Sequence, residues 1–224
     1  MSQDIKTPFG KITPVVSLFP IYYLLFIYGL VYIFPYGKNF IGMSWFDWLR
    51  SEDGPLEWLQ FFEYLFSSLI AFLIFLRQKK KKEINSLIWL LIAFLSLMIA
   101  GEEISWGERL TGFGIGSISD LNVQGETNFH NLPFFHNYLL DPVFEISCIF
   151  LGWFGWRKFK KINALPSREM SLYFLFVALF YFYFDISWAS TTEQIRNDQE
   201  IFEFLLSSGL FIHCLKSLGK TKLK

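Results

Sequence analysis

The stretch that decides the fold is Leu87–Trp106, with the sequence LIWLLIAFLSLMIAGEEISW. As an α-helix rising roughly 1.5 Å per residue, such a run covers about the 30 Å of a bilayer's hydrocarbon core. Two glutamates and a tryptophan close the run, at the depth where the helix would reach the interface with water. The pattern therefore predicts a membrane-spanning helix with a polar end.

Five further apolar runs accompany it along the chain. Together with Leu87–Trp106 they predict an all-α, polytopic membrane protein whose six transmembrane helices form three hairpins. The 53% hydrophobic and 21% aromatic content also exceeds what a soluble domain of 224 residues usually carries. The other runs are Val15–Pro35, Leu56–Leu76, Pro142–Trp156, Met170–Trp188 and Glu200–Leu215.

The charges are divided unequally between the two sides of this arrangement. Six spans put both termini on one side, and that side holds 16 of the 20 Lys and Arg residues, so the positive-inside rule makes it cytoplasmic. The opposite side and the outer helix ends hold 17 of the 20 Asp and Glu residues. The expected organisation is a cytoplasmic segment 1–14, one transmembrane domain 15–215 with an outer loop 107–141, and a basic cytoplasmic tail 216–224.

Several acids stand where a helix does not favour them. Glu102 and Glu103 end the third predicted span, where the helix dipole disfavours an anion. Glu63 lies about 9 Å inside the second span, where an unpaired acid costs on the order of 2.5–3.5 kcal/mol. Helical periodicity directs Glu63, Glu103, Glu145 and Glu203 towards a common polar cavity. There they must be protonated, paired with arginine, or gathered around a cation.

The outer loop adds histidine to these acids. In residues 122–131, NVQGETNFHN, every second side chain is polar, so an extended segment would turn them all the same way. His136 follows His130 by six residues. Imidazole beside carboxylates suits Zn or Mn, whereas carboxylates and amides suit Ca or Mg. The alternative is an ordered loop that caps the bundle through hydrogen bonds, with His136 at the lipid interface. The alternating residues are Asn122, Gln124, Glu126, Asn128 and His130.

The motif GEEISWGER at residues 101–109, followed by N-x-Q-x-E-x-N-x-H-N at 122–131, resembles a family of uncharacterised multi-pass bacterial membrane proteins. The resemblance implies a bacterial cytoplasmic membrane and no particular reaction. The paired glutamates are also similar to the E-E-x-x-x-R motif of the CAAX-processing intramembrane proteases. Here Arg109 stands six residues after Glu103 instead of four, so this second likeness is an analogy.

These observations favour a metal-dependent membrane hydrolase or transferase. Glu103 would be the general base, with Glu102 beside it, and the substrate would be a lipid or another membrane-embedded molecule at the outer leaflet. Nothing indicates a nucleic-acid partner. The alternatives are a cation- or proton-coupled transporter, and a non-catalytic assembly or sensing component. The expected ligands of the divalent ion are Glu126, His130, His136, Glu63 and Glu145.

Overall fold

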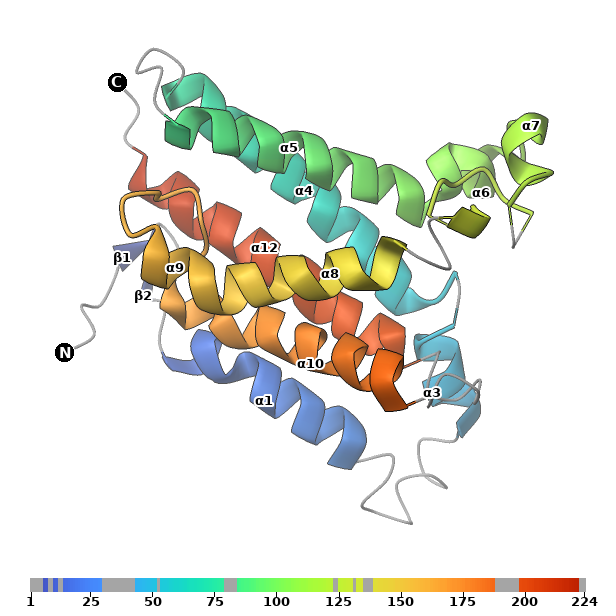
Figure 1. Cartoon of the computed structure of the whole chain (residues 1–224), viewed down its shortest axis with the longest axis horizontal. Coiled ribbons are helices and arrows are strands. Elements are labelled where there is room, and N and C mark those ends of the chain that lie inside the picture. The colour runs from blue at the N-terminus through green and yellow to red at the C-terminus, as the bar shows by residue number, and fades with distance from the viewer. Residues whose placement is uncertain are drawn as a thin grey trace.

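The protein is described by a computed structural model that covers residues 6–7, 10–11, 14–29, 43–51, 53–78, 84–122, 125–130, 132–134, 139–187 and 198–221. These residues are almost entirely helical, apart from an antiparallel pair of two-residue strands, β1 (Lys6–Thr7) and β2 (Gly10–Lys11). The long helices lie roughly side by side, and shorter ones gather at the two ends of the bundle (Figure 1).

Each of the six predicted spans contains a helix. Three of these helices are long and apolar enough to cross a membrane: α4 (Pro55–Gln78), α5 (Ile84–Glu103) and α12 (Gln199–Lys220). The other helices are α1 (Pro14–Tyr28), α10 (Ser171–Ser187) and the series formed by α8 (Leu140–Ile149), the π-helix η5 (Phe150–Phe154) and α9 (Gly155–Lys158). The prediction of an all-helical protein is thus confirmed, and three of the six predicted spans contain a helix with the length and hydropathy needed to cross a membrane.

The helix α4 lies between α5 and α12. It packs along α5 as an antiparallel hairpin and along α12 in the same direction, while α10 joins α12 to α8 and α1 (Figure 1). One end of the bundle carries α3 (Met43–Leu49), η3 (Ser105–Gly107), α6 (Glu108–Thr111) and α7 (Gly116–Ser119). At the opposite end, β1 packs against α12 beside α9 and η6 (Arg168–Met170). We call these the acidic end and the basic end.

The packing of α4 is inverted relative to a helix of a soluble protein. Its buried side chains include Gln60, Tyr64 and Ser67, whereas phenylalanines and leucines such as Phe66 and Leu73 are exposed. The helix α5 repeats the pattern, with Ser96 and Ala100 buried. Polar groups inside and apolar groups outside suit a bundle whose solvent is lipid.

Small residues let the helices approach closely. A Cβ atom added to Gly209 of α12 would lie 2.6 Å from the Cβ atom of Tyr173 on α10. One added to Gly152 would lie 2.8 Å from Leu175 of the same helix. Close backbone approach is how membrane helices gain packing energy, because lipid tails are as apolar as the side chains. The helix α10 is therefore held closely against α12 and η5.

Candidate functional site

The motif at residues 101–109 folds back on the end of α5. Ser105, Trp106 and Gly107 all have positive φ, of 46°, 54° and 90°. This reversal lays the Trp106 ring over Gly101, where an added Cβ would lie 2.9 Å from the ring. Trp106 Nε1 then donates a 2.5 Å hydrogen bond to Glu102 Oε1. The glycine is required for this turn, because any larger side chain at position 101 would displace the indole.

The second carboxylate oxygen of Glu102 binds the outer loop. Oε2 accepts hydrogen bonds from the backbone N–H groups of Phe129 and His130, at 2.7 and 2.9 Å. The same oxygen lies 3.1 Å from Nδ1 of the His130 ring. Glu102 is therefore a loop anchor at the end of α5, and His130 is the partner of Glu102.

Arg109 joins the loop to the start of α4. Its Nη1 donates to Glu57 Oε1 at 2.6 Å and to the Glu103 carbonyl at 3.2 Å, and it lies 3.1 Å from Asp53 Oδ1. Its Nη2 donates to Glu126 Oε2 at 3.0 Å. Although burial opposes the charge, the neighbouring carboxylates of Glu57 and Glu126 raise the pKa of Arg109 above its ordinary value. The guanidinium therefore stays charged and neutralises several acids at once.

Glu126 completes this outer network. Besides Arg109, its Oε2 accepts hydrogen bonds from Ser105 Oγ at 2.5 Å and from Asn128 Nδ2 at 3.2 Å. Asn122 Nδ2 in turn donates to the Asn128 carbonyl and side-chain oxygens. The hydrogen bonds from Ser105 and Arg109 outweigh partial burial and lower the pKa of Glu126. The described part of this loop consists of turns and bends instead of the extended segment expected from its alternation.

A second group of acids lies deeper, between α4 and α12. Ser207 Oγ donates to Glu63 Oε2 at 2.6 Å, and Ser208 Oγ lies 2.9 Å from Glu63 Oε1. Gln60 Nε2 donates to Glu200 Oε2 at 2.8 Å, closer to the acidic end. Within the described residues, the hydrogen bonds to the Glu63 carboxylate thus come from hydroxyl groups of the neighbouring helix. That is a neutral environment for a carboxylate in a membrane-spanning helix.

Glu103 of α5, Glu203 of α12 and Tyr181 of α10 extend this deeper group. Tyr181 Oη donates to Glu203 Oε1 at 2.5 Å. Glu103, half-buried at the end of α5, interacts electrostatically with Glu203, Glu200 and Glu57. The fully buried Tyr64 interacts with Glu103, Glu203 and Glu63. Acids from three helices therefore converge, as the helical periodicity predicts.

The predicted ligands are not brought together as one set. His130 and Glu126 belong to the outer loop network, whereas Glu63 lies between the helices. Glu145 is half-buried on α8, and His136 lies outside the described residues. Over the ranges that the structure describes, no three His, Cys, Asp or Glu side chains are grouped so that they could hold a metal ion.

Comparison of the chain with known proteins identifies no relative. No family matches the chain, and neither a curated protein nor a solved structure is significantly similar to it. The resemblance of residues 101–131 to a bacterial membrane family therefore stays an expectation, and the site is interpreted from its own geometry.

Two groups in the site were not assigned from the sequence. The first is the Asp53–Glu57 turn, where the Asp53 N–H donates to the Glu57 carboxylate and both acids face Arg109. The sequence could have indicated this pairing with Arg109, because Arg109 is one of only four Lys or Arg residues predicted on the acid-rich side. The second is Tyr181, the partner of Glu203, which no spacing distinguishes from the other aromatic residues of α10.

The outer network predicts how acid affects the loop. The pKa of Glu126 is lowered on folding, so its contribution is complete above its ordinary pKa of 4.5 and is lost as the pH falls through the lower folded value. We expect the protection of the backbone amides of residues 125–130 against hydrogen exchange, relative to the intrinsic exchange rate at the same pH, to fall below about pH 4.5. Glu126→Gln should show fast exchange already at pH 7, by at least about tenfold, since hydrogen bonds to charged groups contribute about 1.5–3 kcal/mol. Unchanged exchange in Glu126→Gln, relative to the exposed control Asp120→Asn, would contradict the network.

Proposed function

We propose that the chain is a six-span integral membrane protein, with both termini cytoplasmic, that carries protons or small cations along the contact between α4 and α12. The acidic end would face outward and the basic end the cytoplasm, in the cytoplasmic membrane of a bacterium. The observation that carries the proposal is Glu63, an acid inside an apolar helix whose carboxylate receives hydrogen bonds from Ser207 and Ser208. Intramembrane carboxylates of this kind are typical of proton and ion pathways.

The polar groups near Glu63 form a series along the bundle. The Gln60–Glu200 pair lies towards the acidic end, and Ser67 and Cys214 lie one turn or more towards the basic end. Ser67 Oγ donates to the Glu63 carbonyl at 2.7 Å and also contacts the Cys214 thiol. A carrier needs polar groups in the half of the bundle towards the acidic end and in the half towards the basic end, and this series has polar groups in both.

Proton transfer suits the chemistry of the series better than hydrolysis does. Glu103 interacts electrostatically with Glu200 and Glu203, so charge on one of these acids disfavours charge on the next, and Tyr64 interacts with Glu63 as well as with Glu103 and Glu203. Such a group releases and takes up protons in a coupled way. A bound cation could replace the proton, because carboxylate and hydroxyl oxygens are also its ligands.

The proposed sides of the membrane predict reporter activity. A reporter active only in the cytoplasm should give signal when it is fused after Lys224 or inserted near Lys81, because the basic segments are retained inside. The same reporter should be silent when it is inserted near Ser117, in the loop at the acidic end. The opposite pattern, measured in intact cells, would overturn the assignment of sides.

Glu63 is the residue that tests transport. In liposomes containing a pH-sensitive dye, the wild-type protein should carry protons when a membrane potential is imposed, and Glu63→Gln should reduce the flux at least about tenfold, since the amide cannot ionise. Asp120→Asn, an exposed acid in the outer loop, is the matched control. Equal flux through wild type and Glu63→Gln, or wild-type flux no greater than in protein-free liposomes, would refute the proposal.

The metal-dependent hydrolase or transferase is a second proposal, and the Glu102–His130 pair favours it. A carboxylate at Nδ1 fixes the tautomer of an imidazole and leaves Nε2 as the atom that can bind a metal. Glu126 also acts electrostatically on His130. In this version Glu103 is the general base, and a lipid or membrane-embedded substrate approaches from the outer leaflet.

Metal analysis of the purified protein tests this second function. The metal-dependent function predicts about one divalent ion per chain in the wild-type protein. The ion should be lost in His130→Ala, since the imidazole of His130 would be one of its ligands. His213→Ala changes the same residue type at the opposite end of the bundle and should leave the metal content unchanged. If wild type and His130→Ala contain the same amount of metal, His130 is not a ligand.

A further inference from the structure

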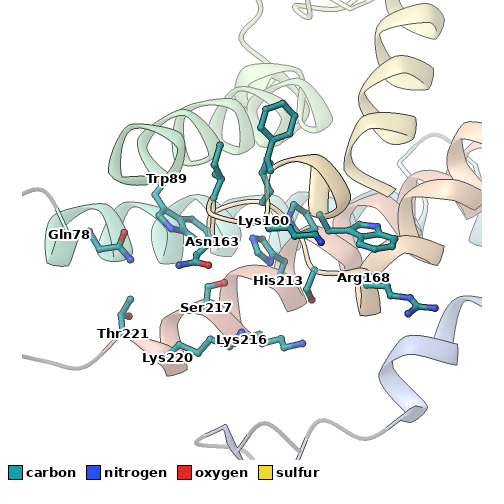
Figure 2. Close-up of a pocket in the computed structure, with 16 residues that line it drawn as sticks. Gln78, Trp89, Lys160, Asn163, Arg168, His213, Lys216, Ser217, Lys220 and Thr221 are labelled. Carbon is teal, nitrogen blue, oxygen red and sulfur yellow. The ribbon is translucent and has the colours of Figure 1, made fainter. Parts of the chain in front are cut away.

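The basic end contains a cavity of about 540 Å³ that the carboxylate site does not use. It lies between the end of α4, the start of α5, the segment 156–168 and the last turns of α12. In Figure 2, Gln78 and Trp89 lie on one side of it, Ser217 and Lys216 on another, and His213 at the centre. The size is that of a site for a small organic ligand, which typically occupies about 300–1,000 Å³.

The charges around this cavity are mainly positive. Lys160, Arg168, Lys216 and Lys220 line it, and Lys216 pairs with Glu169. Lys216 and Lys220 repel each other, and both also act unfavourably on a positive charge at His213. The side chains of Lys160 and Lys220 are exposed, so they can turn towards a ligand at low cost. An anion in the cavity would relieve this repulsion.

Hydrogen-bonding groups are also available in the wall. Ser167 lines the cavity, and its Oγ is buried without a hydrogen-bond partner among the described residues. Asn163 and Ser217 add further donors. Buried polar atoms are normally satisfied, so an orphan hydroxyl beside a cavity points to a ligand atom that would complete its bonding. Several donors together with lysines suit the oxygens of a phosphate group.

We propose that this cavity binds a phosphate-bearing anion, and that its source is the headgroup of an anionic phospholipid. The aromatic residues Trp89, Trp156 and Phe159 line the cavity beside the bases, as amphipathic rings do at the depth of lipid headgroups. Basic cavities between membrane helices bind such headgroups. The site is independent of the carboxylates at the acidic end, so either proposal can fail alone.

The test is a calorimetric titration of the purified full chain in a neutral detergent. The probes are dioctanoyl phosphatidylglycerol, zwitterionic dioctanoyl phosphatidylcholine and inorganic phosphate. We expect saturable binding of phosphatidylglycerol and at least about tenfold weaker binding by the double variant Lys160→Gln/Lys220→Gln. The matched control Lys158→Gln/Lys161→Gln removes two exposed lysines that do not line the cavity, and its affinity should stay within about twofold of wild type.

The outcomes separate the sources of the anion. Binding of phosphatidylglycerol that depends on Lys160 and Lys220 supports the lipid headgroup. Binding of inorganic phosphate alone, with the same dependence, supports the anion site and overturns its lipid source. Equal losses in the two double variants would reveal unspecific attraction to charge and would overturn the site, as would equal binding of the two lipids or no binding at all. Because all four lysines are exposed, we expect the unliganded variants to unfold at the wild-type temperature.

Discussion

The structure depends on one constraint: a carboxylate in an apolar surrounding needs a partner supplied by the protein itself. The outer faces of α4 and α5 are leucine and phenylalanine, so polar side chains gain their hydrogen bonds only by turning inward. Two kinds of partner meet this need. Arg109 neutralises the acids at the mouth of the bundle, and hydroxyl groups of α12 and α10 serve the acids within it.

This division gives the two halves of the acid group different properties. Around Arg109 the charges are compensated, so the outer loop behaves as an anchored cap in which Glu102 and Glu126 are structural acceptors. Around Glu63 the partners are neutral, so a proton can be gained or lost without breaking an ion pair. The adjacent acids Glu102 and Glu103 therefore have different surroundings. Glu102 accepts hydrogen bonds from the outer loop, whereas Glu103 interacts with the acids Glu200 and Glu203 of α12.

The fold was largely predictable, because hydropathy and helical periodicity are local properties of the sequence. They located helix in each predicted span, three of them long and apolar enough to cross a membrane, and they predicted a helical fold for the chain. The outer loop was less predictable, because its shape depends on the positive φ values of Ser105 and Trp106, residues that rarely adopt them. His130 was expected beside Glu103 or Glu126 and lies against Glu102, and the cavity beside His213 assembles segments too distant for any spacing to reveal.

The contact between Glu63 and Ser207 has a consequence for the biogenesis of the protein. The two residues are 144 positions apart, so the hydroxyl groups that receive Glu63 are made long after its helix. At roughly 5–20 residues per second, the ribosome needs on the order of 7–30 s to add them. During that interval the polar face of α4 is incomplete. A chain that stopped before α12 would lack Ser207 and Ser208, so the Glu63 carboxylate would be without the two hydroxyl groups that donate to it in the complete bundle.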